Sequence, residues 1–111
     1  MMDQIKKERF DARARILKAL AHPTRLFIVD QLEQQERSVN ELTAMVGADV
    51  STVSKHLSQL KQVGIVRDEK RGNHVFYHLA VPCVMNFFDC VEAVIEEQHL
   101  RHMRLVNGDG D

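Results

Sequence analysis

The sequence has no apolar run near the roughly 20 residues needed to span a bilayer. Its charged N-terminus, with Lys6, Lys7 and Arg9, is not followed by the apolar core of a signal peptide. It has only two cysteines, which argues against a disulfide framework and leaves buried thiols, a metal site or a redox switch. We therefore expect a cytoplasmic protein without a membrane partner.

Signs of catalysis are also missing. The chain has no glycine-rich phosphate loop, no acid pair in an apolar setting, and no nucleophile beside a base and an oxyanion hole. We therefore expect a binding protein and not an enzyme. With 111 residues and 44% hydrophobic content, it supports one domain over residues 1–106 and a disordered tail at 107–111. A core of that size is thin for five helices and a hairpin, which favours a partner chain.

The net charge of −1 is unevenly distributed. Residues 51–78 carry five basic and two acidic side chains, whereas residues 79–111 carry two basic and six acidic ones. A weakly basic segment on a mildly acidic body predicts few phosphate contacts per chain. A nucleic-acid binder of this kind would act as a dimer on two half-sites.

The segment 49–64 predicts a helix with one apolar and one polar face. Hydroxyl, amide and ammonium groups on a slender helix suit a major groove, where they reach base edges and phosphates. An ordinary surface helix has the same pattern, so the neighbouring segments must decide. The apolar stripe comprises Val50, Val53, Leu57 and Leu60, and the polar face comprises Ser51, Lys55, Ser58 and Gln62, flanked by Thr52 and Gln59.

The neighbouring segments favour DNA. Residues 38–47 predict a short helix with a capping box, Ser38 with Glu41, closed by Gly47. A short helix, a glycine turn and a polar-faced helix follow the helix-turn-helix order. Residues 65–70 and 74–79 then predict a hairpin that resembles a wing. The expected fold is mainly α with a small β-hairpin: a dimeric winged helix-turn-helix of about five helices and a two-stranded wing.

The predicted partner is double-stranded operator DNA. A protein-docking wing would more often carry apolar side chains at its tip, whereas this one carries Lys70 and Arg71. His56 lies between the two faces of its helix, so it either bonds within the motif or touches a phosphate. The predicted DNA-binding residues are Ser51, Thr52, Ser54, Lys55, His56, Ser58 and Gln59 on the helix and Lys70, Arg71, Asn73 and His74 on the wing.

The remaining segments predict a scaffold for a homodimer. Helices are expected over 3–20, over 23–34 and from Pro82 to about Leu105, and the last has two adjacent apolar seams. One seam can face the subunit core and the other a partner helix across a two-fold axis. The predicted interface residues are Ile5, Phe10, Phe87, Phe88, Val91, Val94 and Ile95.

Four segments resemble the ArsR/SmtB family of winged-helix repressors: residues 19–26 (ALAHPTRL), 54–60 (SKHLSQL), 64–66 (GIV) and 71–79 (RGNHVFYHL). Together they are specific, and the similarity covers nearly the whole chain. The resemblance implies a homodimeric bacterial or archaeal repressor that occupies an operator. An inducer, often a metal ion or a thiol-reactive species, would then weaken DNA binding.

The inducer sites of that family are not matched. Arsenic- and cadmium-responsive relatives carry a Cys-x-Cys where this chain has residues 38–42 (SVNEL), which supply no soft thiolate. Zinc-responsive relatives place ligands where this chain has Val81, Cys83, Val94 and Glu97. Since valine cannot bind a metal, the resemblance implies at most a partial site.

Cys83 and Cys90 remain the main candidates for sensing. Seven residues apart on one helix face, they are too far apart for a disulfide or a shared metal within one chain, so chelation would cross subunits. They are either small packing residues or a sensor of a thiophilic metal, metalloid or oxidant, and a non-metal inducer is the alternative. No cofactor is required for the fold. His99 and His102 are spaced for one metal ion, but near the end of the chain an exposed pair without a metal is the favoured interpretation.

Overall fold

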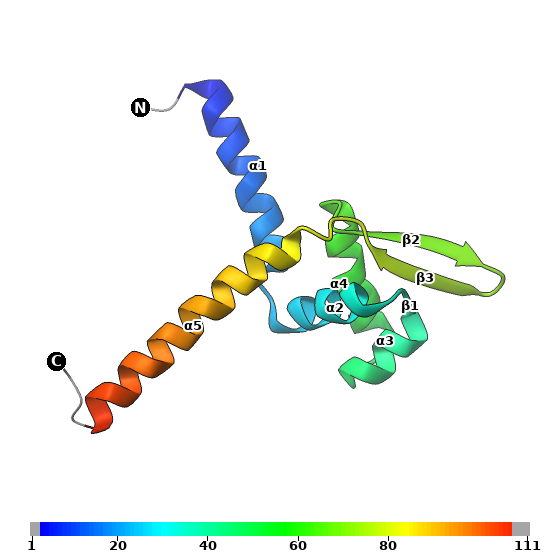
Figure 1. Cartoon of the computed structure of the whole chain (residues 1–111). Helices are drawn as coiled ribbons and strands as arrows, with labels where there is room; N and C mark the ends of the chain where they lie inside the picture. The colour runs from blue at the N-terminus through cyan, green and yellow to red at the C-terminus, as the bar shows by residue number, and fades with distance from the viewer. Residues whose placement is uncertain (1–2, 108–111) are drawn as a thin grey trace. The chain divides into compact units, whose positions relative to one another are not determined.

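The computed structural model describes residues 3–107, which form two compact units that join at Val81 and Pro82. The order of elements confirms the predicted winged helix-turn-helix (Figure 1). The single domain predicted over 1–106 stays a prediction. The elements are α1 (Gln4–Leu20), α2 (Pro23–Gln34), β1 (Arg37–Ser38), α3 (Val39–Val46), α4 (Val50–Gln62), β2 (Val66–Arg71), β3 (His74–Leu79) and α5 (Val84–Asn107).

Local sequence signals set most helix boundaries. The Asp3 carboxylate caps α1 by accepting from the Lys6 backbone N–H at 2.8 Å. At the start of α3 the predicted capping box is present: the Glu41 N–H donates to Ser38 Oγ at 3.1 Å, and the Ser38 N–H donates to Glu41 Oε1 at 3.2 Å. Gly47 ends α3 with φ of 77°, a left-handed conformation that glycine adopts without a Cβ clash.

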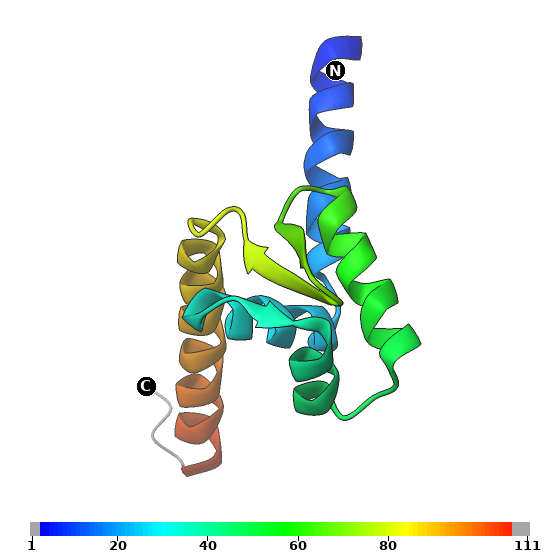
Figure 2. The ribbon, with the colours of Figure 1, turned by 90° about the vertical axis from the view of Figure 1, so that its right-hand side faces the viewer.

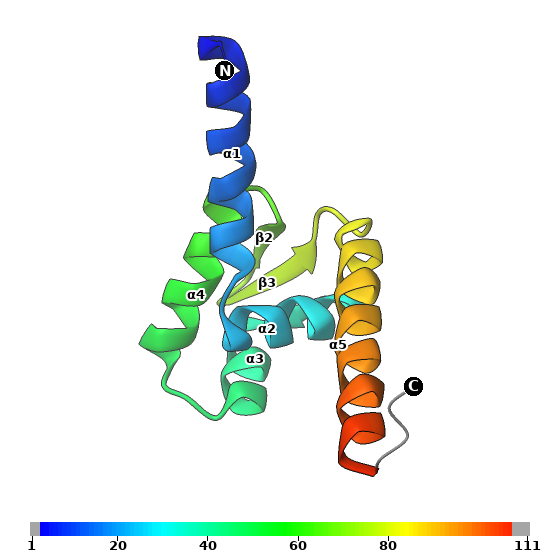
Figure 3. The same cartoon turned by 90° about the vertical axis from the view of Figure 1, so that its left-hand side faces the viewer.

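The core of the first unit lies where α2, α3 and α4 meet the base of the sheet (Figure 3). The apolar stripe predicted on α4 accounts for much of it, since Val53, Leu57 and Leu60 are fully buried. Val50 departs from that prediction: it is 51% exposed because it lies in the first turn of α4, beyond the edge of the core. The other fully or almost fully buried side chains are Leu20, Ile28, Val29, Leu32, Leu42, Ile65 and Val66.

The wing is part of a three-stranded antiparallel sheet with the order β1-β3-β2 (Figure 2). The sequence predicted only the hairpin, because the two residues of β1 are too few to show a period. Arg71 is the last residue of β2 and pairs with His74, so the turn is Gly72-Asn73 alone. Gly72 has φ of 62° whereas Asn73 has a negative φ, as in a type II′ turn.

Much of α1 is exposed. Only Ala19 and Leu20, at its C-terminal end, are buried, and the N-terminal part projects away from the other helices of the first unit (Figures 1 and 3). Ile5 and Phe10, two predicted interface residues, are 74% and 51% exposed. Bare apolar area on a projecting helix is consistent with a contact outside this unit.

The second unit consists mainly of α5, and no residue of this helix is buried. Among the interface residues predicted on α5, Phe88 is half-buried. Asn107, predicted to begin the tail, is instead the last residue of α5, and the rest of the predicted tail lies outside the described residues. Across residues 3–107, no helix combines the length and apolar character needed to cross a membrane. The exposed interface candidates are Phe87, Val91, Val94 and Ile95.

Candidate nucleic-acid interface

The outer face of α4 is a row of exposed polar side chains. It stands opposite the buried stripe, so the helix is anchored by one face and free on the other. Lys55 makes no ion pair with any residue in 3–107, which leaves its ammonium available to an external anion. The exposed members of the predicted reading face are Ser51, Thr52, Ser54, Lys55, Ser58 and Gln59.

A carboxylate caps the start of α4. Asp49 Oδ1 accepts the Thr52 backbone N–H at 2.7 Å and the Ser51 hydroxyl at 3.0 Å. Hydrogen bonds from Thr52 and then Ser51 hold the pKa of Asp49 below its usual value, so the group is ionised at neutral pH. The reading face therefore begins with a negative charge, and one of the hydroxyls predicted to read DNA is already bonded to it.

A hollow of about 260 Å³ lies between α4, the start of α3 and the wing. It brings together three predicted DNA-binding residues from two elements: Ser54 from α4 and Asn73 and His74 from the wing. Asn40 lines it from the first turn of α3. A polar concavity beside a polar helix fits a phosphate backbone that follows the groove.

Arg71 is tied into a cluster that the sequence did not reveal. Its guanidinium donates to both oxygens of Glu36, with Nη2 to Oε2 at 3.0 Å, and Nη2 also donates to Glu69 at 2.9 Å. Its Cζ lies 4.9 Å from the centre of the Phe76 ring. These bonds raise the pKa of Arg71 and lower those of Glu36 and Glu69. The predicted phosphate contact at Arg71 would have to displace or share these carboxylates.

Lys70, near the tip of the wing, is without a carboxylate partner among residues 3–107. It is exposed and makes no ion pair within residues 3–107, unlike its neighbour Arg71. On the opposite side of the hairpin, His74 lies edge-on to Phe76 with ring centres 6.4 Å apart. The tip of the wing thus offers one free ammonium and one imidazole.

His56 is bonded inside the motif, which favours the first of its two predicted roles. Its Nδ1 accepts a hydrogen bond from Arg25 Nε at 3.0 Å, and its ring centre lies 4.5 Å from that of His22. Burial, followed by the charges of His22 and Arg25, lowers the pKa of His56. Arg25 also donates to the Ala19 carbonyl at 3.2 Å. This network ties α4 to the junction of α1 and α2.

His22 caps the start of α2 at that junction: its Nδ1 accepts the Thr24 backbone N–H at 3.1 Å. His56 lies 31 residues from Arg25 along the chain and further still from His22, which is why spacing alone could not pair them.

The sensing candidates do not both lie within α5. Cys83 lies in the turn before α5, which begins at Val84, because Met85 and Asn86 donate to the Pro82 and Cys83 carbonyls in short three-residue turns. Both Cys83 and Cys90 are free and exposed, as are His99 and His102. Within residues 3–107, no three His, Cys, Asp or Glu side chains gather closely enough to hold a metal ion.

The fold and the exposed polar face of α4 define the class of the protein. It is a winged helix-turn-helix domain in which α4, the second helix of the motif, carries the polar face. The family described as "Bacterial regulatory protein, arsR family" matches residues 22–68. The chain belongs to this family, whose members are transcriptional regulators and not enzymes.

Curated relatives agree with this assignment. The chain is 42% identical over 74 residues to the HTH-type transcriptional repressor SmtB of Mycobacterium tuberculosis, covering 67% of this chain and 55% of the relative. It is 33% identical to the HTH-type transcriptional regulator KmtR of the same species, covering 84% and 74%. The chain thus spans only about half the length of the first curated relatives.

Solved structures show the same architecture. The homodimeric winged helix-turn-helix DNA-binding domain of Mb0332 from Mycobacterium bovis superposes with a TM-score of 0.75 at 35% identity, covering 91% of this chain and 93% of that one. NolR from Sinorhizobium fredii gives a TM-score of 0.78 at 29% identity, covering 85% and 94%.

Proposed function

We propose that this chain is a homodimeric, sequence-specific repressor that binds operator DNA and leaves it when an inducer binds. In this proposal α4 enters the major groove with its exposed polar face, and the wing contacts the backbone beside it. The main support is the pairing of a buried apolar stripe and an exposed polar face on α4, next to the hollow that Ser54 shares with the wing.

The assignment of individual side chains follows from their surroundings. Lys55 and Lys70 have no carboxylate partner among residues 3–107, so they are the cations we assign to direct contact. Lys61, by contrast, pairs with Asp68 at 3.0 Å and fastens the end of α4 to β2. Thr52, Ser58 and Gln59 are exposed along α4 and can reach base edges.

A homodimer would present two copies of α4 to two half-sites. Exposed apolar side chains on α1 and α5 support this part of the proposal. The solved relative from Mycobacterium bovis is described as homodimeric. A single chain with few unpaired cations on its reading face also gains from a second copy, because each released counterion adds to affinity.

Cys83 and Cys90 are the residues we assign to the inducer, as thiols for a thiophilic metal, metalloid or oxidant. Their exposure supports this role, since a sensing thiol must be reached by its ligand. With no third ligand near them in residues 3–107, a metal would need donors from a second chain.

The proposal can be tested by fluorescence anisotropy with the reduced protein and DNA from upstream of its own gene. Arsenite, zinc, cadmium and peroxide are titrated into complexes of the wild type and of the double variant Cys83→Ser/Cys90→Ser. Tight binding that one of these reagents reverses only in the wild type supports the whole proposal. If DNA is bound tightly and none of these reagents reverses the binding, Cys83 and Cys90 are not the inducer site. If the protein shows no preference for one DNA sequence, it is not an operator-binding repressor.

A further inference from the structure

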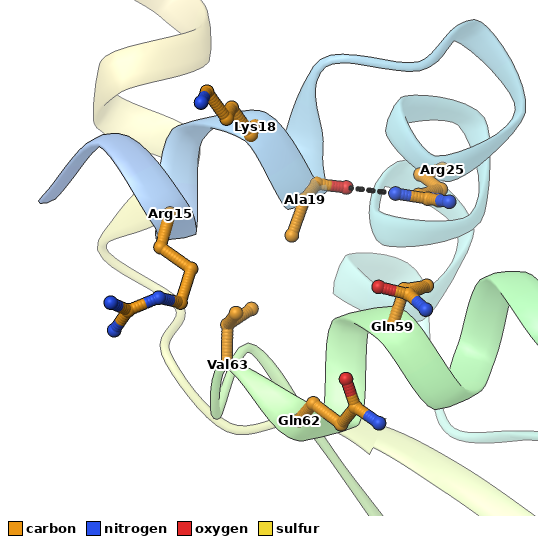
Figure 4. A pocket seen from close by; sticks show the side chains of 7 residues that line it. All are labelled: Arg15, Lys18, Ala19, Arg25, Gln59, Gln62 and Val63. Carbon is orange, nitrogen blue, oxygen red and sulfur yellow. Dashed lines mark hydrogen bonds between the residues drawn. The ribbon is translucent and has the colours of Figure 1, made fainter. Parts of the chain in front are cut away.

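A basic cavity lies in the first unit on the side of α4 that faces α1 and α2 (Figure 4). Its volume is about 460 Å³, within the range of small-molecule sites. Apolar surface comes from Ala19 and Val63. The polar residues that line it are Arg15 and Lys18 from α1, Arg25 from α2, and Gln59 and Gln62 from α4.

Among residues 3–107, three basic side chains and no carboxylate line the cavity. Arg15, Lys18 and Arg25 make no ion pair with any residue in 3–107. The C-terminal ends of α1 and α4 both border the cavity, and each carries a partial charge of about −0.5. Together they offset only about one of the three unit charges, so the cavity keeps a surplus of positive potential.

Arg25 is held in a fixed orientation at one wall. It donates through Nε to His56 and through Nη1 to the Ala19 carbonyl, and the second bond is drawn in Figure 4. Its Nη2 makes no hydrogen bond with residues 3–107. A guanidinium fixed by two bonds loses little conformational freedom when it binds an oxyanion with its remaining donors.

We propose that this cavity is a binding site for a small phosphate-bearing molecule. Guanidinium groups from two helices can take the phosphate oxygens, and the Gln59 and Gln62 amides can donate to the same group. No aromatic ring from residues 3–107 lines the cavity, so these residues offer no platform for a nucleobase. An aliphatic phosphate ester fits better, with its carbon chain against Ala19 and Val63.

The position of the cavity gives its ligand access to the DNA-reading helix. Gln59 belongs both to the cavity wall and to the proposed reading face, and Arg25 bonds directly to His56 of α4. A ligand that draws Gln59 inward removes it from the groove side. The site itself does not depend on the proposed function, because ligand binding is measured without DNA.

Isothermal titration calorimetry on the full chain tests the site with inorganic phosphate and with glycerol 3-phosphate, at constant ionic strength in chloride buffer. We expect saturable binding that is at least as tight for the ester. The double variant Arg15→Ala/Lys18→Ala should bind about tenfold more weakly or worse, because it loses two charge-assisted contacts. The matched control Lys6→Ala/Arg9→Ala removes the same charges at the same spacing from an exposed part of α1 and should bind as the wild type does.

Nuclear magnetic resonance of the wild type locates the site without any substitution. Added phosphate should shift the side-chain amide signals of Gln59 and Gln62, and shifts confined to other residues would overturn the proposal. If Arg15→Ala/Lys18→Ala and Lys6→Ala/Arg9→Ala lose equal affinity for phosphate, the binding reflects a general attraction of anions. That outcome would also overturn the proposal.

DNA is the competing source of phosphate. If the wild type does not bind free phosphate but Arg15→Ala/Lys18→Ala weakens binding to random duplex DNA and lowers its salt dependence, the cavity contacts the DNA backbone and the small-molecule site is wrong. If the proposed operator binding fails while phosphate still binds at Gln59 and Gln62, the site stands alone.

Discussion

Single residues on the proposed DNA face divide into those with internal partners and those without. Hydrogen bonds or ion pairs within the chain occupy polar groups of His56, Arg71 and Ser51. Lys55 and Lys70 make no such bond with residues 3–107. A side chain without an internal partner can bind DNA without first breaking a bond. Substitutions at the two kinds of residue should therefore act differently.

Replacement of Lys55 or Gln59 by alanine should weaken operator binding by roughly 1 to 3 kcal/mol and relax its sequence preference, as expected for contacts to base edges. Anisotropy with operator and random DNA measures both effects. Lys6→Ala removes one charge from the exposed N-terminal part of α1 and is the matched control. Unchanged operator affinity in both reading-face variants would mean that another face reads the DNA.

Arg71→Ala should weaken binding to operator and random DNA alike and lower the salt slope by about one unit if Arg71 reaches a phosphate. The ion pairs with Glu36 and Glu69 add a second expectation. Glu36→Gln weakens the competition for Arg71 and should raise affinity for both DNAs. Arg67→Ala, an exposed arginine at the base of the same strand, is the control. If Arg71→Ala lowers affinity for the operator but not for random DNA, Arg71 contacts bases and not only the phosphate backbone.

His56 should make stability depend on pH. Its pKa is lowered in the folded chain, so the unfolded chain binds the extra proton first as the pH falls. The neutral form that accepts from Arg25 is fully favoured above about pH 6.5, the unfolded value, and this contribution is lost as the pH falls toward the folded pKa. Urea unfolding at pH 7.5 and 5.5 should show a smaller pH effect in His56→Gln than in the wild type. Equal pH effects would contradict this assignment.

At the scale of elements, interactions between residues close in sequence set the helix ends, and contacts between distant residues set how the elements pair and pack. The capping box of α3 and the proline at the start of α2 were readable in the sequence and are present. β1 was not, because its pairing with β3 depends on contact between Ser38 and Phe76 across the fold. Its presence places Glu36 within reach of Arg71.

Substitutions at Asp49, the cap of α4, can separate its effect on folding stability from the effect of its charge on DNA binding. Asp49→Ala should lower the free energy of unfolding by about 1 kcal/mol, because a Thr52 N–H loses its acceptor. Asp49→Asn keeps an acceptor but removes the charge, so its stability should stay near that of the wild type while its affinity for DNA rises. Urea unfolding and anisotropy measure the two effects. Equal instability in both variants would show that the charge itself holds the cap.

At the scale of the whole molecule, exposed apolar side chains on α1 and α5 point to a second copy of the chain. Acidic residues are concentrated in 79–111 and basic residues in 51–78, so we expect the second segment to attract DNA more strongly than the first. A dimer that buries the apolar side chains and pairs two α4 helices would use both features.

Phe88→Asp or Val94→Asp should dissociate the dimer, since a charge in an apolar interface has no partner there. Sedimentation velocity at micromolar concentration reports the change. Glu92→Ala, an exposed change on the same helix, should leave the dimer intact. Val94 is 55% exposed in the single chain, so its variant should fold normally. Intact dimers in both aspartate variants would place the interface elsewhere.

The sequence by itself determined the order of helices, the hairpin and the amphipathic pattern of α4, because caps, turns and periodicity act over a few residues. Only the tertiary structure decided that Arg71 is held by Glu36, that His56 accepts from Arg25 and that Val50 lies outside the core. It also assembled the basic cavity from three helices. These features join residues far apart in the chain, and side-chain hydrogen bonds and ion pairs require contact in space, which sequence spacing does not record.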